Sequence, residues 1–146
     1  MLKPPEATGP AAHAARPAGE LTESPFKGKT GMVRILHAFF NSLAGLADAW
    51  RHESAFRQEI LLAIVLIPAA CWIPVSAVEC ALLIGTVLLV LIVELLNTSV
   101  EAAIDRISFD RHSLSKRAKD IGSAAVFLTL VLLAVVWGLI LPHALF

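Results

Sequence analysis

The sequence predicts an all-α membrane protein, with three transmembrane helices preceded by an N-terminal amphipathic helix that lies in the membrane interface. Composition is the first reason, because 57% of the 146 residues are apolar and only 16% are charged, against about a quarter in an ordinary soluble domain. A single soluble core of this length could not bury so much apolar surface. Hydropathy is the second reason, because the apolar residues form long uncharged stretches. The formal net charge is zero, which gives no support to a nucleic-acid-binding surface.

The N-terminal region has two parts of different character. Residues 1–25 are rich in Pro, Ala, Glu and Thr without hydrophobic periodicity, so we expect a disordered extension in front of a membrane-embedded domain at 26–146. Residues 31–52 have the apolar spacing of an amphipathic helix, with Thr30 as a candidate N-cap. Its apolar stripe comprises Met32, Ile35, Leu36, Phe39, Leu43, Leu46 and Trp50. The helix could pack on a soluble core, but the spans that follow favour the membrane interface.

Three uncharged stretches follow this helix. They cover residues 60–78, 80–93 and 121–146. A membrane span needs about 20 residues, so the second stretch is long enough only if its helix continues past Glu94. Pro68 interrupts the first stretch without excluding a kinked span. The expected spans are about 56–74, 78–104 and 119–141.

The basic residues indicate the orientation of these spans. Lys and Arg are concentrated before the first span and between the second and third, whereas the turn at 74–80 and the C-terminal tail have none. The positive-inside rule therefore predicts a cytoplasmic N-terminus, a cytoplasmic loop at 105–120 and a C-terminus outside. Trp72 and Trp137 would then lie near the outer interface and Trp50 near the inner one, as an aromatic belt requires.

The richest polar pattern lies on the second span. On a helix, five polar residues share a stripe about 100° wide that descends from membrane depth to the cytoplasmic surface. An ionisable group at that depth costs at least about 2.5 kcal/mol, so it needs a partner or a purpose. The groups could satisfy one another between helices, or their oxygens could hold a proton or a hard cation such as Mg²⁺. The stripe consists of Glu94, Asn97, Thr98, Glu101 and Asp105.

Two further clusters flank the spans. Glu53 and Arg57 are four residues apart and can pair on one helix face, while Glu59 points elsewhere. Residues 116–125 combine basic side chains, suited to phosphates or lipid head groups, with a patch of small residues at 122–125 that permits close helix contact. Either cluster could instead be an ordinary charged helix end or a topology signal.

Three runs of sequence resemble the signature stretches of the bacterial diacylglycerol kinases and their undecaprenol kinase relatives. They are ESAFRQE at 53–59, IVELLNTSVEAAIDRI at 92–107 and RAKDIGSAA at 117–125. The resemblance extends from about Gly31 to the C-terminus. It implies a three-span kinase of the bacterial inner membrane that works as a homotrimer. Such an enzyme transfers the γ-phosphate of ATP to diacylglycerol with Mg²⁺, giving phosphatidic acid.

The resemblance also implies roles for individual residues. Glu94 would be the general base, and Glu53 and Glu101 would hold the metal ion. From the geometry of the stripe, Asn97 could orient Glu94 or the phosphate, and Asp105 is a further supporting residue. The residues expected to contact ATP are Arg34, Asn41, Glu53, Glu101, His112, Lys119 and Asp120. Those expected to contact the lipid are Arg34, Ser42, Trp50, Arg57, Glu59, Glu94 and Ser123. The sequence departs from the family pattern at Asp110 and Arg111, where better-known members have a Glu–aromatic pair.

Three other functions remain open from the sequence. An undecaprenol kinase would perform the same chemistry on a longer prenyl alcohol. A proton- or cation-coupled transport subunit would explain a buried Glu94, but it gives no role to Glu53 or to the Lys119–Asp120 pair. A purely structural assembly subunit would tolerate Leu throughout the polar stripe.

Overall fold

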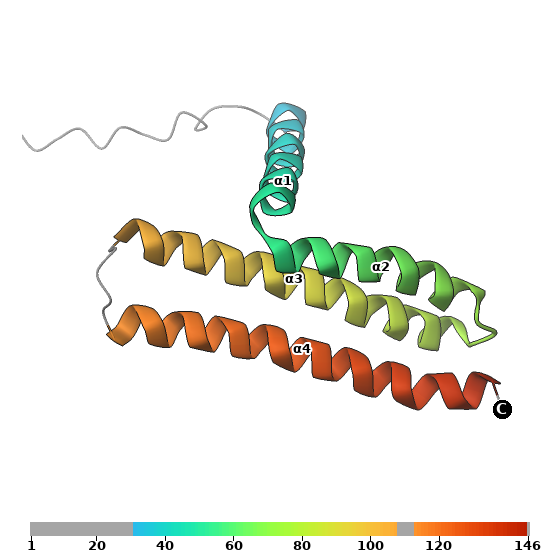
Figure 1. Ribbon diagram of the computed structural model, residues 1–146. Coiled ribbons are helices and arrows are strands. Elements are labelled where there is room, and N and C mark those ends of the chain that lie inside the picture. Colours follow the sequence, from blue (N-terminus) through green and yellow to red (C-terminus); the bar gives the residue numbers. More distant parts are fainter. Residues whose placement is uncertain (1–30, 108–112, 146) are drawn as a thin grey trace, which may run out of the picture. The chain divides into compact units, whose positions relative to one another are not determined.

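The computed structural model describes residues 31–107 and 113–145, and all regular secondary structure in these ranges is helical (Figure 1). The four helices are α1 (Met32–His52), α2 (Ser54–Trp72), α3 (Ala77–Ile107) and α4 (Ser113–Leu145). The predicted class, an all-α chain with three long apolar helices after a first helix, is confirmed. The extension expected at 1–25 and the candidate N-cap Thr30 lie outside the described residues.

The chain divides into two compact units, residues 1–38 and residues 39–146. In the first unit the structure describes only the beginning of α1. Gly31 precedes this helix with a φ of 56°, a left-handed conformation that a glycine adopts without steric penalty because it has no Cβ. The rest of α1 and all of α2, α3 and α4 belong to the second unit, which contains the helix packing described below.

Among the described residues, α2, α3 and α4 are each long and apolar enough to cross a membrane. The 19 residues of α2 span about 28 Å at 1.5 Å per residue, close to the roughly 30 Å of a bilayer core. Pro68 lies inside α2, which stays helical to Trp72. The 31 residues of α3 span about 46 Å. This helix therefore continues well past Glu94, as the prediction of a second span requires.

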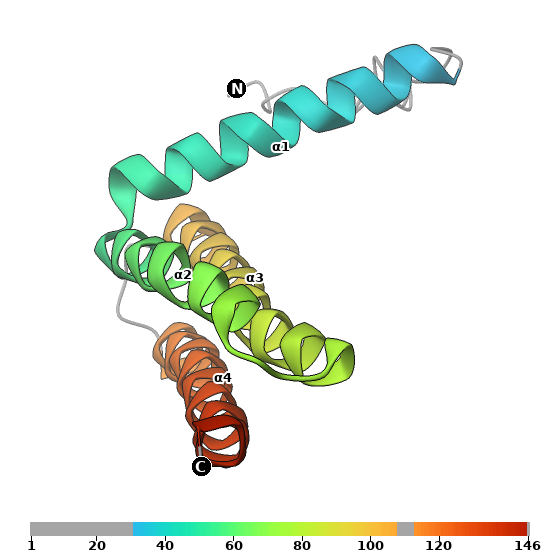
Figure 2. The same cartoon turned by 90° about the vertical axis from the view of Figure 1, so that its right-hand side faces the viewer.

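The helix α3 packs against both α2 and α4, so it forms the centre of the bundle (Figures 1 and 2). Small side chains let α2 approach α3 closely, because Ala63 and Ala70 of α2 are buried beside Leu83 and Val87 of α3. Trp137 of α4 completes this core. The core lies in the part of the bundle nearest to the α2–α3 turn.

Trp137 does not serve as the interfacial anchor that an aromatic belt predicts. It is 7% exposed, and its indole Nε1 donates a hydrogen bond to the carbonyl oxygen of Leu83 at 3.3 Å. A buried indole needs such an acceptor, and the α3 backbone supplies it inside the bundle. Trp72, at the end of α2, is exposed as expected of a residue at the membrane interface.

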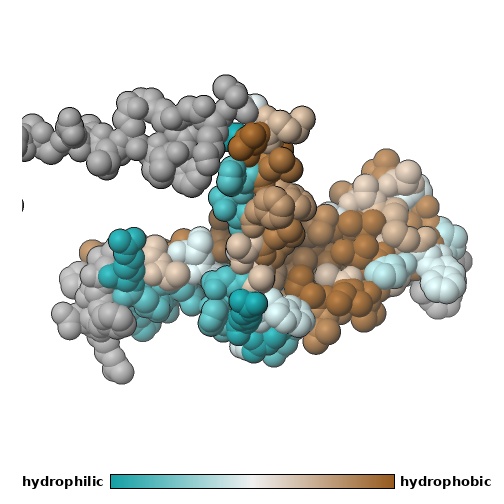
Figure 3. Space-filling view, turned by 90° about the horizontal axis from the view of Figure 1, so that it is seen from above, coloured by the Kyte–Doolittle hydropathy of each residue, from teal (hydrophilic) through white to brown (hydrophobic). Residues whose placement is uncertain are grey.

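Large apolar side chains outside this core remain exposed along all three long helices. Examples are Leu61, Val65, Leu96, Phe127 and Leu128. Figure 3 shows hydrophobic residues over most of the half of the bundle near the α2–α3 turn, whereas hydrophilic residues gather toward the end where α3 finishes. An apolar surface of this extent is typical of a protein that faces lipid.

The apolar stripe of α1 is exposed too. Within the second unit, Phe39, Leu43, Leu46 and Trp50 are each 42–56% exposed, and Ala49 is the buried residue of this helix. These side chains do not pack on a core of this chain. The finding argues against the soluble-core alternative and agrees with an amphipathic helix that presents its apolar face to a membrane.

A capping box begins α3. The amide N–H of Ser76 donates to Oε2 of Glu79 at 2.8 Å, and the amide N–H of Glu79 donates to the Ser76 hydroxyl oxygen at 3.3 Å. The Ser76 hydroxyl also donates to Glu79 Oε2 at 2.6 Å. These bonds satisfy amide groups that the first turn of a helix cannot pair internally. They fix the residue at which α3 begins.

Replacing Ser76 with Ala is expected to lower the free energy of unfolding by about 1 kcal/mol, the usual effect of removing a hydroxyl N-cap. The measurement is the unfolding midpoint of the full chain in detergent micelles. Ser54→Ala is the matched control, since Ser54 is exposed at the first position of α2 and its hydroxyl makes no hydrogen bond within the described part of the chain. Equal midpoints for the two variants would contradict the capping role.

Candidate active site

Among the described residues, Glu94 is the charged residue that is buried, with a relative exposure of 4%. The helix α3 carries it into the bundle where α2 begins. The charges of Glu53, just before α2, and of Glu101, two turns along α3, act on Glu94. Glu94 acts in turn on Glu59 of α2. Three carboxyl groups of α2 and α3, and that of Glu53 just before α2, therefore lie near one another at the polar end of the bundle.

Glu53 occupies the N-cap position of α2, but its side chain makes no capping hydrogen bond. The pairing with Arg57 that the spacing allows is not formed: none of the ion pairs among residues 31–107 and 113–145 joins these two. Instead the Arg57 guanidinium donates to the carbonyl oxygens of Trp50 at 3.1 Å and Arg51 at 3.3 Å. The last carbonyls of a helix lack internal donors, and Arg57 supplies them for α1. The Glu53 carboxylate consequently stays available for a ligand.

The charge of Glu94, on α3, acts on Glu59 of α2. Glu59 is half-buried, and its Oε2 is buried without a hydrogen-bond partner among the described residues. A buried carboxyl oxygen without a donor is rare in a folded protein, and a like charge beside it adds repulsion. A proton, a cation or a hydrogen-bond donor of a ligand would pair with this oxygen and reduce the repulsion.

The amide of Asn97 connects the acidic cluster to α4. Its Nδ2 donates to Oε1 of Glu101 at 3.1 Å, and its Oδ1 is buried without a hydrogen-bond partner in the part of the chain that the structure describes. Asn97 lies one turn from Glu94 on the same helix. Asn97, which we expected to orient Glu94 or a phosphate, donates to Glu101 instead in the structure.

Two ion pairs organise the polar end of the bundle. Nζ of Lys119 lies 2.6 Å from Oδ1 of Asp105, which joins α4 to α3, and Nζ of Lys116 lies 2.6 Å from Oδ2 of Asp120 within α4. The charge of Glu101 also acts on Lys119. Lys119 thus places a positive charge beside the acidic cluster, and Asp105 holds it there.

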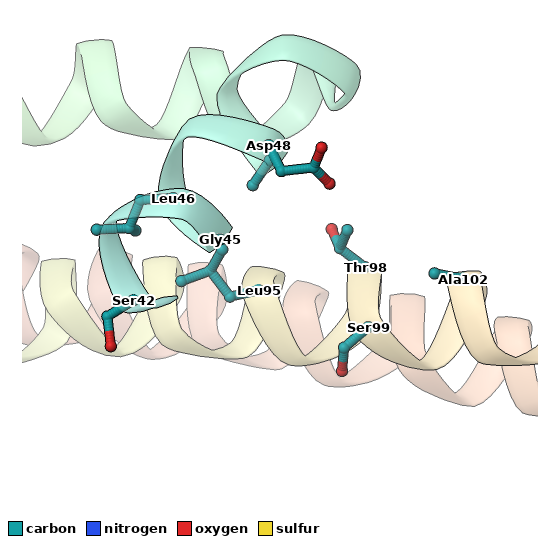
Figure 4. Close-up of a pocket in the computed structure, with 9 residues that line it drawn as sticks. Ser42, Gly45, Leu46, Asp48, Leu95, Thr98, Ser99 and Ala102 are labelled. Atoms are coloured by element: carbon teal, nitrogen blue, oxygen red, sulfur yellow. The ribbon is translucent and has the colours of Figure 1, made fainter. Parts of the chain in front are cut away.

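A cavity of about 500 Å³ opens between α1 and α3 (Figure 4). Asp48 and Thr98 extend into the space between the two helices, and Leu95 points toward Gly45. Ser42, Leu46 and Thr98 are singled out by the sequence patterns, whereas most of the other lining residues are not. The pattern of small residues on the two helices is a signal that could have found them, because such residues permit close helix approach. The lining residues are Ser42, Gly45, Leu46, Asp48, Ala49, Leu95, Thr98, Ser99 and Ala102.

The other predicted contact residues lie at the edges of this arrangement. Asn41 and Trp50 are exposed on α1, and Ser123 is exposed on α4. Arg34 is exposed on the first turn of α1, in the unit that comprises residues 1–38. His112, which the resemblance assigns to ATP, lies outside the described residues, as do Asp110 and Arg111.

The structure brings oxygen donors together without forming a complete metal cage. Within residues 31–107 and 113–145, no group of three His, Cys, Asp or Glu side chains is placed to hold a metal ion. Mg²⁺ usually binds one or two carboxylates and completes its shell with water and substrate phosphates. The carboxylates of Glu53 and Glu101, whose charges both act on Glu94, fit that kind of binding.

Three membrane-length helices with a buried carboxyl group, further acids and a lysine at their polar end define an integral membrane protein with an enzyme-like site. Oxygen donors and a positive charge lie side by side there, which suits phosphate chemistry. Comparison with known proteins identifies the family, since residues 40–141 match the family model described as prokaryotic diacylglycerol kinase. The chain belongs to this family.

Three curated relatives match most of the chain. The chain is 55% identical over 121 residues to the diacylglycerol kinase of Pseudomonas aeruginosa, which covers 83% of this chain and 98% of the relative. It is 46% identical over 112 residues to the diacylglycerol kinase of Escherichia coli K12, covering 77% and 92%. The diacylglycerol kinase of Haemophilus influenzae is also 46% identical over 112 residues, covering 77% and 95%. The resemblance read from the sequence is confirmed.

Proposed function

We propose that this protein phosphorylates diacylglycerol, with ATP as the phosphate donor, at the cytoplasmic face of the bacterial inner membrane. The burial of Glu94 among other carboxyl groups, at the polar end of a membrane-length bundle, carries the proposal. Family membership supports it, because the relatives are named diacylglycerol kinases. A transport subunit would leave Glu53 and Lys119 without a role.

The length of α3 supports a site at the membrane interface. With Ala77 at the outer membrane surface, Glu94 lies about 26 Å along the helix, just within a hydrocarbon core of roughly 30 Å. Asp105 lies about 42 Å along it, beyond that core. The hydroxyl of diacylglycerol lies at the interface and ATP arrives from the aqueous side. The polar stripe of α3 covers the interval where the two substrates would meet.

Glu94 would act as the general base. It would accept the proton of the lipid hydroxyl while the hydroxyl oxygen attacks the γ-phosphorus in line. Since the side chain of Glu94 is buried, bulk water has little access to it. The lipid hydroxyl rather than water would then receive the phosphoryl group.

Glu53 and Glu101 would hold Mg²⁺ together with phosphate oxygens. Both charges act on Glu94, and neither a helix cap nor Arg57 occupies the Glu53 carboxylate. When bound, the ion would neutralise charge on the β- and γ-phosphates. The hydrogen bond from Asn97 would orient Glu101 for this task.

Lys119 would add positive charge to the phosphates, and a phosphate oxygen would take the place that Asp105 has beside it. Asp120, Asn41, Arg34 and His112 remain proposed nucleotide contacts.

The cavity between α1 and α3 suits the glycerol and the first part of an acyl chain, because Leu46 and Leu95 are apolar. The further lipid contacts that we propose are Ser42, Trp50, Arg57, Glu59 and Ser123.

We also infer a homotrimer with a cytoplasmic N-terminus and a C-terminus outside. Three helices of one chain do not fully enclose the polar stripe, since Glu101 is partly exposed and Asp105 is exposed. Exposed apolar side chains along α2 and α4 could pack on neighbouring copies or on lipid. The positive-inside rule supports the orientation, and the exposed apolar face of α1 supports a place in the cytoplasmic interface.

Phosphorylation of lipid by the purified full-length chain tests the function. The protein is reconstituted in vesicles that contain equal molar fractions of diacylglycerol and undecaprenol, and labelled ATP is added with Mg²⁺. Labelled phosphatidic acid as the main product is expected. A main product of undecaprenyl phosphate would change the assigned substrate. If no lipid is labelled, the kinase assignment fails, and ion uptake into the same vesicles would test the transport alternative.

A further inference from the structure

Gly122 of α4 lies directly against the side chain of Asn97. A Cβ built on Gly122 would overlap Oδ1 of Asn97 and lie 3.3 Å from its Cγ. The corresponding positions at Gly45, Gly85 and Gly138 have no neighbouring atom within 4 Å. Among the described glycines, Gly122 is therefore the one whose missing side chain makes room for another residue.

The amide of Asn97 can take only one orientation in this place. The NH₂ group of Asn97 is the donor of this amide, and it faces Glu101, to whose Oε1 it donates at 3.1 Å. The opposite atom, Oδ1, then faces Gly122. The amide is held between a carboxylate of its own helix and the backbone of α4.

The close approach is specific to one position in the patch of small residues at 122–125. Gly122 is partly buried, whereas Ser123, Ala124 and Ala125 are exposed. Position 122 is therefore the partly buried position of this patch. Its neighbour is Asn97, and the hydrogen-bond partner of Asn97 is Glu101.

We propose that Gly122 is a positioning residue of the active site, which leaves space for the Asn97 amide and so keeps that amide bonded to Glu101. The proposal rests on the proposed function, because Glu101 matters to catalysis only if the protein is the kinase. Gly122 touches no substrate in this proposal. It acts through Asn97 alone.

The substitution Gly122→Ala is expected to lower kcat by about 10- to 100-fold, since displacement of a site residue by about 1 Å can have an effect of this size. The added Cβ would force the Asn97 side chain into another rotamer and break its bond to Glu101. The KM for diacylglycerol is expected to stay within about twofold of the wild-type value, because the cavity between α1 and α3 is unchanged. Gly138→Ala is the matched control on the same helix, where the Cβ meets open space, and it should keep wild-type kcat.

A double-mutant cycle separates a positioning role from a general packing role. Asn97→Ala removes the amide and the overlap together. If Gly122 acts through Asn97, adding Gly122→Ala to Asn97→Ala lowers neither kcat nor the unfolding temperature any further. If the double variant instead has a kcat lowered by the product of the two single effects, the proposal is overturned. A wild-type kcat in the single variant Gly122→Ala would overturn it too.

The cycle decides even if Gly122→Ala does not fold. Folding that is restored when Asn97→Ala is added supports the proposal, because the overlap is then with Asn97. A double variant that still does not fold overturns it. Absence of kinase activity in the wild-type protein would instead defeat the proposed function, and this outcome is distinct from all the others.

Discussion

Glu94→Gln is expected to lower kcat by at least about 100-fold, the usual range for the loss of a general base. Gln has nearly the shape of Glu but cannot take a proton from the lipid hydroxyl. The KM for ATP is expected to stay near its wild-type value, because Glu94 would act on the lipid and not on the nucleotide. The measurement is initial-rate kinetics of the full-length chain in vesicles or mixed micelles, with both substrates varied.

Stability separates this chemical effect from misfolding. The neutral amide removes repulsion from Glu53 and Glu101, whose charges act on position 94, so the variant is expected to unfold no more easily than the wild type. Glu79→Gln is the matched control, because it makes the same change on the same helix. Gln can replace Glu in a capping box, and the control should keep full activity. Turnover near the wild-type rate in Glu94→Gln would remove Glu94 from the role of base.

The second large effect is expected from Glu53→Gln and Glu101→Gln. Each change removes one negative charge that would hold Mg²⁺. The Mg²⁺ concentration for half-maximal activity should rise by about tenfold or more, since losing even an outer partner of a metal site weakens binding by about 10- to 100-fold. Gln at position 101 still offers an oxygen to Asn97, so the hydrogen bond at that position survives. The measurement is a Mg²⁺ titration at saturating ATP and lipid.

The same titration of Glu94→Gln provides the comparison for the metal assignment. Its residual activity should need the same Mg²⁺ concentration as the wild type, because Glu94 is assigned to the proton and not to the metal. Glu79→Gln should also match the wild type. An unchanged Mg²⁺ requirement in both Glu53→Gln and Glu101→Gln would rule out these two residues as the metal-holding pair.

Much of the fold could be predicted because the relevant signals are local. Hydropathy and length identify three spans, and the need for about 20 residues predicts that α3 passes through position 94, as it does. The capping box at the start of α3 was missed, although its signal is also local. Ser76 and Glu79 have the spacing of such a box and form one in the structure, but a hydropathy pattern does not detect this motif.

The sequence predicts which helix carries the acids of the candidate site, but not all the pairs that the side chains of the site form. Helical spacing places Glu94 and Glu101 on one stripe, and the structure has their charges interacting. The same reasoning allows a pair between Glu53 and Arg57, yet Arg57 binds the end of α1 instead. Spacing rules describe one continuous helix, whereas the chain changes direction at Glu53.

The sequence by itself determined the class of the protein, the helix that carries the acids and the family, since composition, periodicity and motifs are properties of the chain. The tertiary structure decided which polar groups meet across helices. Trp137 turns into the bundle, Lys119 reaches Asp105, and Asn97 fits against Gly122. The physical reason is that contacts between helices depend on how each helix is rotated about its axis and how far it is displaced along that axis. Packing of the whole bundle sets these two quantities, and no local pattern encodes them.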